Sequence, residues 1–132
     1  MSELLYTLTA RFIKLEEIGN LPKGYRRNAH FMGDVAGQLS GKIRGIDYVI
    51  EQKGVTKTHI HEVLTTDKEE KISIERYGVS VPTQDPDLLL IDGTAIMETA
   101  SEGLSWVNDL PIKWRARINR KKADFTVEVF RS

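Results

Sequence analysis

The sequence predicts an all-β protein, a single antiparallel up-and-down β-barrel of eight to nine strands with one short helix. The first reason is an alternation of apolar and polar residues along most of the 132-residue chain. The alternation is clearest from Ile112 to Ile118, where a period of two places the apolar side chains on one face of a strand. The second reason is that glycine and proline separate the alternating runs, whereas helical signals are sparse. Closure into a barrel would remove exposed strand edges, and we expect one domain, residues 1–132.

Nine segments carry the strand pattern. They lie near residues 3–13, 25–32, 34–44, 46–52, 55–65, 70–81, 93–100, 111–120 and 123–131. Gly33 and Gly45 fall between neighbouring segments and are therefore expected in turns. The short helix is expected in residues 85–90, because Asp85 can cap a first helical turn that begins with Pro86.

The last two strands can be paired by the chemistry of their side chains. A short turn after residue 120 sets Trp114 opposite Val129 on the apolar face. The same register sets Arg115 opposite Glu128 on the polar face. Apolar groups then meet apolar groups and opposite charges meet, so this hairpin should bury Trp114 in the core.

Two further hairpins decide which polar groups enter the barrel. A turn at residues 44–45 would point Tyr48 inward and leave Asp47 on the surface. A turn around residues 68–69 would point His59, His61 and Arg76 inward together. In this second hairpin a slip of a single residue would reverse the orientation of both histidines.

An inward polar cluster on an apolar face favours a small-molecule-binding barrel as the first function hypothesis. A buried Arg76 would need a carboxylate such as Glu98, or an anionic ligand, to balance its charge. Trp106 and Asn108 could stack on and hydrogen-bond a ligand at a barrel mouth, or could instead cap the barrel and turn the chain. The candidate ligand-binding residues are Tyr48, His59, His61, Arg76, Glu98, Trp106, Asn108 and Trp114.

The two histidines also have a spacing that can share a metal ion. Residues i and i+2 of a strand lie about 7 Å apart on the same face. Glu98 or His30 could supply a third ligand to His59 and His61. Histidines that bond to neighbouring groups, or that simply face solvent, explain the same pattern. We therefore expect no metal and no other cofactor.

Four parts of the chain carry a family resemblance. They are Gly37–Lys42, Gly45–Tyr48, Leu64–Asp67 with Ile72–Gly78, and Glu98–Thr99 with Trp106–Asn108. In order and spacing they resemble the uncharacterised bacterial family called domain of unknown function 3237, over nearly the whole chain. The resemblance implies a small barrel similar to lipocalin-type and allene-oxide-cyclase-type barrels, without a settled activity or known catalytic residues. The chain departs from the family pattern at Lys68-Glu69, where a glycine is usual, and at His59, where an aspartate is common.

Two other classes of function stay open. One is an isomerase or cyclase that uses His59, His61 or Glu98 for acid/base chemistry in the barrel. The chain has no cysteine, so catalysis by a thiolate is excluded. The other is a non-catalytic interaction module that forms a homodimer through the edges of its first and last strands.

Charge and hydropathy limit the classes of partner that this protein is expected to have. Nineteen basic residues balance nineteen acidic ones, which argues against a nucleic-acid partner. The longest apolar run, Leu88–Ile91, is far too short to span a membrane. The first residues read as a strand and not as a signal peptide, and the lack of cysteine suggests no oxidising compartment. We therefore expect a cytoplasmic protein that has no membrane partner and takes a small-molecule ligand.

Overall fold

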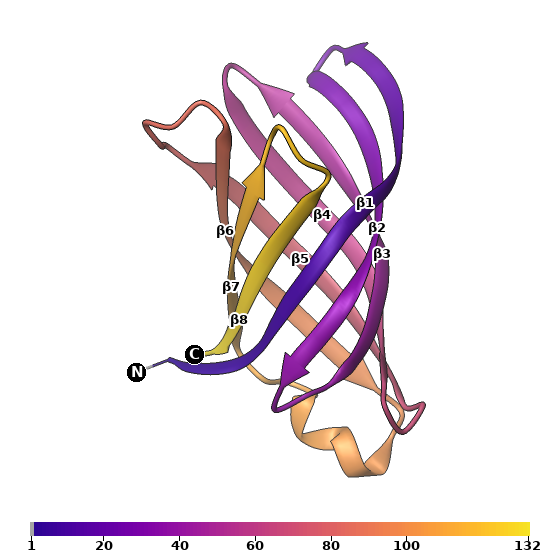
Figure 1. Cartoon of the computed structure of the whole chain (residues 1–132). Helices are drawn as coiled ribbons and strands as arrows, with labels where there is room; N and C mark the ends of the chain where they lie inside the picture. The colour runs from indigo at the N-terminus through magenta and orange to yellow at the C-terminus, as the bar shows by residue number, and fades with distance from the viewer. Residues whose placement is uncertain (1) are drawn as a thin grey trace.

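Eight antiparallel strands close into one up-and-down barrel in the computed structural model, which describes residues 2–132 (Figure 1). The strands are β1 (Glu3–Leu21), β2 (Gly24–Gly37), β3 (Gly41–Gln52), β4 (Val55–Thr66), β5 (Lys71–Val81), β6 (Leu88–Thr99), β7 (Ile112–Asn119) and β8 (Asp124–Arg131). Each strand pairs with the next one along the chain, and β8 pairs with β1 to complete the barrel. The predicted fold is therefore confirmed. Within the described residues, no helix has the length and apolar character needed to cross a membrane.

The predicted turns at Gly33 and Gly45 are wrong, because both glycines lie inside long strands. A Cβ atom on Gly33 would meet the backbone oxygen of Thr9 at 2.3 Å, and one on Gly45 would meet the backbone oxygen of His61 at 2.5 Å. The two glycines thus permit a close approach of neighbouring strands. Three predicted strands, 25–32, 34–44 and 46–52, are consequently two, and the nine predicted strands become eight.

Among the described residues, the single short helix lies elsewhere than predicted. Residues 85–87 form a turn, in which the N–H of Asp87 donates to the side chain of Asp85 at 2.9 Å, and β6 begins at Leu88. A strand forms there because residues from Leu88 onward pair with β7, and from Leu90 onward also with β5. The helix in the structure is the 3₁₀ helix η1 (Glu102–Val107), which buries Val107 completely.

The two ends of the barrel differ. Helix η1, the start of β1 and the end of β8 lie at one end (Figure 1). There Leu104, Val107 and Leu110 pack against the core and close the barrel. The β1–β2, β3–β4 and β7–β8 turns and the β5–β6 loop gather at the other end. Several inward side chains that line a cavity at this second end are small, among them Ala29, Thr56 and Thr58. Small side chains leave space, so the barrel is closed at one end and hollow at the other.

The predicted register is correct in the last hairpin but wrong in β3 and β4. Trp114 faces Val129 and Arg115 faces Glu128, as expected. In β4, His59 pairs with Tyr77 and His61 with Glu75, so both histidines point outward.

The register of β4 differs from the prediction because polar residues line part of the barrel interior. The inward residues of β4 are Thr56, Thr58, Ile60, Glu62 and Leu64. Glu62 is fully screened from solvent and pairs with the inward Arg76, a partnership that the apolar pattern does not reveal. In β3 there is no turn at 44–45, so Asp47 is buried and Tyr48 faces outward, the reverse of the prediction.

Candidate functional site

A buried ion pair lies in the interior of the barrel. Arg76 of β5 is 1% exposed, which agrees with the prediction that its side chain points into the barrel. Its Nε–H and an Nη2–H donate to the carboxylate of Glu62 of β4. The Nε–Oε2 and Nη2–Oε1 distances are 2.7 and 2.9 Å, which is the bidentate geometry of a strong pair. Glu98, the predicted partner, lies exposed on the outer face of β6. The prediction of an Arg76–Glu98 pair is therefore wrong.

Aromatic rings complete the surroundings of Arg76. Its guanidinium lies 4.7 Å from the ring centroid of Trp114 and 6.0 Å from that of Phe31. The indole N–H of Trp114 donates to the backbone oxygen of Thr94 at 2.9 Å. A Cβ atom on Gly78 would come within 2.6 Å of the same indole ring, so this glycine makes room for Trp114. The ring is thereby fixed beside the charge.

Buried polar atoms without a hydrogen-bond partner lie close to this pair. Within residues 2–132 they include Oδ1 of Asp47 and Oγ1 of Thr58. Burial raises the pKa of Asp47 to about 7, and the positive charge of Arg76 only partly opposes this effect. Tyr6 also buries an unpartnered hydroxyl, and burial raises its pKa. Unpartnered buried polar groups are costly, so they mark a place where a ligand could bind.

A cavity of about 390 Å³ leads from the open end of the barrel down to Asp47 and Thr58. Its walls are mostly apolar and include Phe12, Ile91 and Ile118. A much smaller space of about 20 Å³ shares all five of these residues and extends to Arg76 and Trp114. Arg76 thus lies beneath the pocket that opens to solvent, lining the small space that adjoins the base of the pocket.

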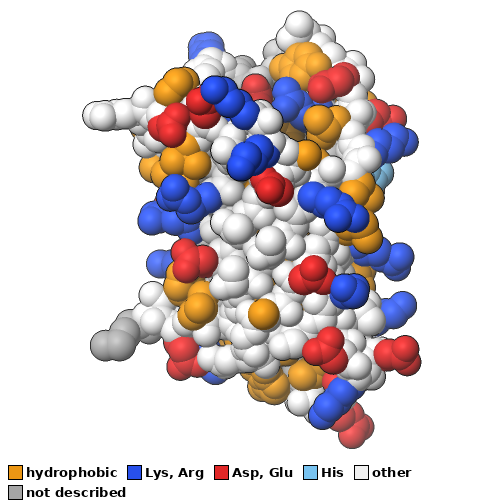
Figure 2. Space-filling view, in the orientation of Figure 1, with side chains coloured by type: hydrophobic (Ala, Val, Ile, Leu, Met, Phe, Trp, Pro, Cys, Tyr) orange, Lys and Arg blue, Asp and Glu red, His pale blue; other side chains and the backbone are white. Residues whose placement is uncertain are grey.

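The rim of this pocket is mainly basic. Arg27 of β2 and the residues Arg120 and Lys122 of the β7–β8 turn line the mouth, together with the acidic Glu51. Arg27 lies 3.6 Å from a carboxylate oxygen of Glu17. Elsewhere on the visible face, basic, acidic and apolar side chains are interspersed (Figure 2). The excess of positive charge at the mouth would favour a ligand that carries an acidic group.

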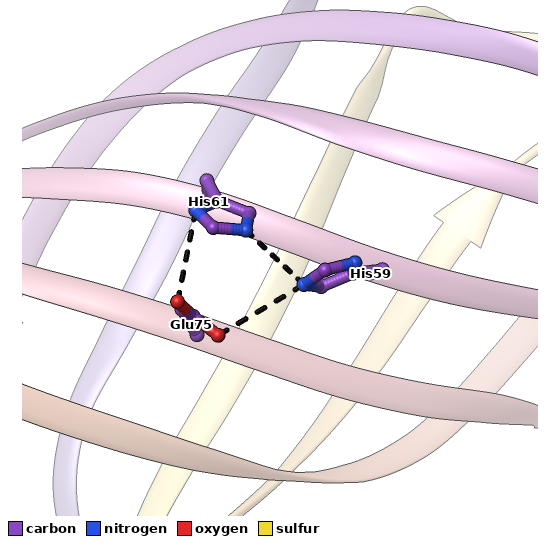
Figure 3. A group of neighbouring side chains, drawn as sticks. All are labelled: His59, His61 and Glu75. Atoms are coloured by element: carbon purple, nitrogen blue, oxygen red, sulfur yellow. Dashed lines mark hydrogen bonds and ion pairs between the residues drawn. The ribbon is translucent and has the colours of Figure 1, made fainter.

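The two predicted histidines form a second cluster on the outer face. Nε2 of His59 lies 3.1 Å from Nε2 of His61, and each ring has a nitrogen 3.9 Å from a carboxylate oxygen of Glu75 (Figure 3). Tyr48 is outside the barrel beside them, with its ring centroid 6.1 Å from that of His61. The prediction that Tyr48 and the histidines line the barrel interior is wrong. The structure nevertheless brings these three residues together.

The remaining predicted residues lie away from both groups. Asn108 accepts a hydrogen bond from the backbone N–H of Thr99 at 2.9 Å, and its amide donates to the backbone oxygen of the same residue at 3.4 Å. This is the chain-turning role weighed as the alternative for Asn108. Trp106 is 40% exposed on η1 at the closed end, and Glu98 lies outside the barrel. None of these three lines the pocket.

The sequence-based prediction missed three buried polar residues of the interior: Asp47 and Thr58, which line the pocket, and Glu62, which pairs with Arg76. One signal in the sequence could have revealed them: Thr56, Thr58 and Glu62 share one face of β4 with two aliphatic residues. Polar residues in such a row need a buried partner, and Arg76 was already expected inside. Combining these two observations would have favoured the correct register.

Comparison with known proteins shows what this barrel resembles. A protein of unknown function from Clostridium acetobutylicum superposes with a TM-score of 0.88 at 20% identity, covering 99% of this chain and 97% of the other. A β-barrel-like protein from Acinetobacter baumannii gives 0.86 at 22% identity, covering 99% and 94%. An enzyme from Penicillium herquei gives 0.69 at 14% identity, covering 99% and 92%. At these identities the likeness establishes the fold.

The same comparisons leave the family open. No family model matches the chain, and no curated protein matches it. The chain is therefore similar in structure to bacterial β-barrel proteins of unknown function. The resemblance to domain of unknown function 3237 stays a prediction.

Proposed function

We propose that this protein binds a small organic molecule inside the barrel, entering through the open end. The observation that carries the proposal is the pocket of about 390 Å³, with apolar walls and unpartnered buried polar atoms at its base. Its size falls within the usual range of ligand sites, about 300–1,000 Å³. Closure of the opposite end by η1 leaves one entrance, so the ligand would lie with one end at the floor and the other at the mouth.

The lining residues indicate the chemistry of the ligand. A hydroxyl group on the ligand could donate to Oδ1 of Asp47 and accept from the hydroxyl of Thr58, which would satisfy both atoms. A ring or short apolar body would fit between Phe12 and Ile118. An acidic substituent would lie near the basic residues of the mouth, such as Arg120. These features together favour a hydroxylated ring compound that carries a carboxylate or a similar acidic group.

A thermal-shift screen of hydroxylated aromatic and alicyclic acids would test the proposal, since a ligand of the folded state raises the unfolding temperature. Ligands found with the wild-type protein would then be titrated calorimetrically against Thr58→Val and Asp47→Asn. The matched control is Thr126→Val, because Thr126 lies on the outer face of β8. We expect weaker binding in the two pocket variants and unchanged binding in the control. Equal affinity in all four proteins, or a screen without any stabilising compound, would contradict the proposal.

A second candidate function is proton-transfer catalysis in the same pocket. It is favoured by one observation, the pKa of about 7 that burial gives Asp47, because an acid/base group works best near the ambient pH. His59, His61 and Glu98, the residues first considered for this role, all lie outside the barrel. A compound from the screen would be incubated in D₂O and followed by NMR. Exchange of a carbon-bound proton in the wild type that is lost in Asp47→Asn would support catalysis, and equal exchange in both would exclude Asp47 as the base.

The interaction-module hypothesis receives less support from the geometry. The edges first considered, those of β1 and β8, pair with each other from Glu3–Arg131 to Arg11–Asp124. Homodimer formation, the lack of nucleic-acid and membrane partners, and a cytoplasmic location stay predictions. So does the assignment to domain of unknown function 3237, which the likeness to bacterial barrels of unknown function supports at the level of fold.

A further inference from the structure

We propose that His59, His61 and Glu75 form a Zn²⁺-binding site on the outer face of β4 and β5. The site is separate from the pocket and does not depend on its function, because these side chains point away from the barrel interior (Figure 3). One potential ligand atom from each residue lies within 4.8 Å of the other two. Two imidazoles and one carboxylate are a ligand set that zinc uses in proteins.

The pairing of β4 with β5 places the three residues together. His59 and His61 are residues i and i+2 of β4, so they share a face of the sheet. Glu75 is the direct cross-strand partner of His61 on β5. Directly opposed side chains have Cβ atoms about 4.5–5.5 Å apart, which brings the carboxylate beside the rings.

The distance between the two histidine nitrogens is close to that of a zinc site, and the Glu75 oxygen lies somewhat farther away. The two Nε2 atoms lie 3.1 Å apart, and Nε2 of His59 lies 3.9 Å from Oε2 of Glu75. Zinc–nitrogen bonds of about 2.0–2.1 Å with tetrahedral angles separate two nitrogen ligands by roughly 3.3 Å. Small rotations of the side chains would therefore suffice to bind the ion.

Tyr77 holds two of the ligands in place. Its ring stacks on that of His59, with centroids 4.5 Å apart and an interplanar angle of 16°. Its hydroxyl donates to Oε2 of Glu75 at 2.7 Å. The carboxylate is thereby oriented beside the two imidazole rings. Such outer contacts commonly tune the affinity of metal sites.

Solvent can reach the remaining coordination positions. The side chains of His59, His61 and Glu75 are 44, 51 and 40% exposed. A surface hollow of about 440 Å³ adjoins His61 and is lined also by Arg44. Three protein ligands with an accessible fourth position are the arrangement of zinc sites that bind water or a further ligand.

Metal binding would be measured on the chain without a histidine tag, by calorimetry with Zn²⁺ and by the visible absorption of bound Co²⁺. We expect one Zn²⁺ per chain and the spectrum of a tetrahedral Co²⁺ site. His61→Ala and Glu75→Gln should each weaken binding by about 10-fold or more, and Tyr77→Phe, which keeps the stacked ring, by about 10-fold. All three side chains lie outside the core, and circular dichroism would confirm that the variants fold.

The chain provides a matched control, since it has three histidines and only His30 lies outside the cluster. His30→Ala should leave the affinity for Zn²⁺ unchanged. If the wild type binds no Zn²⁺, or if His30→Ala weakens binding as much as His61→Ala, the proposed site is wrong. Binding that is insensitive to Glu75→Gln would equally overturn the three-ligand site.

Discussion

Replacing Asp47 by asparagine should make the protein more stable at neutral pH and change its response to pH. Burial raises the pKa of Asp47 from its ordinary value of 3.8 to about 7 in the folded protein. Between these two values the folded state binds a proton that the unfolded state has already released. The free energy of unfolding of the wild type therefore falls as pH rises from about 4 to about 7 and is constant above that range.

The size of this effect follows from the shift in pKa. Each pH unit corresponds to about 1.4 kcal/mol per proton, so the wild type should lose about 4 kcal/mol over the whole range. Asp47→Asn has nearly the same shape and does not titrate, so it should lack this loss. Its stability relative to the wild type should rise by the same amount between pH 4 and pH 7.5.

Urea unfolding at half-unit intervals of pH would measure both proteins, with Asp92→Asn as a control. The hydrogen bond from Arg115 lowers the pKa of Asp92 below its ordinary value of 3.8, so the stability that this carboxylate contributes is lost only as pH falls below about 4. Asp92→Asn should therefore run parallel to the wild type between pH 4 and pH 7.5. Parallel stability profiles of wild type and Asp47→Asn between pH 4 and pH 7.5 would refute the reasoning. They would mean that water reaches the carboxylate and that the base of the pocket is not dry.

Three further predictions concern packing, and the same unfolding assay checks each. Trp114→Ala should lower the free energy of unfolding by about 3–5 kcal/mol, because the ring is 3% exposed and its removal leaves a cavity. Arg115→Ala removes a surface ion pair and should change stability little. The opposite ranking of the two variants would mean that the faces of β7 are reversed. Glu62→Ala should cost about 3–5 kcal/mol by leaving the Arg76 charge buried alone, and replacing both residues by methionine should restore most of the loss. If the double methionine variant does not regain stability, the pair contributes more than charge balance. Gly78→Ala should cost about 1–3 kcal/mol, since its methyl group would lie 2.6 Å from a rigid indole ring, and an unchanged midpoint would imply that the ring can move.

The barrel could be predicted from the sequence where two independent patterns agree. In the hairpin of β7 and β8, the apolar residues Trp114 and Val129 and the opposite charges of Arg115 and Glu128 predict the same register. The structure has this register, although Arg115 forms its ion pair with Asp92 of β6. A slip by one residue would have broken both patterns. Agreement between burial and charge is therefore what made this part of the fold predictable.

The site was harder to predict, because the interior of β4 is polar. Its inward face includes Thr58 and Glu62, whereas the apolar Val63 lies on the outer face, so the hydrophobic pattern does not distinguish the two faces. The register is settled by the Glu62–Arg76 pair, which joins two strands and which no single strand reveals. The turn predicted at Gly45 is wrong for a similar reason. This glycine permits a close approach to a neighbouring strand, which the sequence alone does not identify.

The pairing of β1 with β8 has a consequence for how the chain folds as it is made. Glu3 pairs with Arg131, so the barrel cannot close until the whole of β8 has been synthesised. Until then the first strand has one edge without hydrogen-bond partners, and such an edge can pair with another chain. Contacts between residues so far apart in the sequence also form slowly, because a long loop must close first. The interval between synthesis of the first strand and arrival of the last is thus the period in which this protein is most exposed to aggregation.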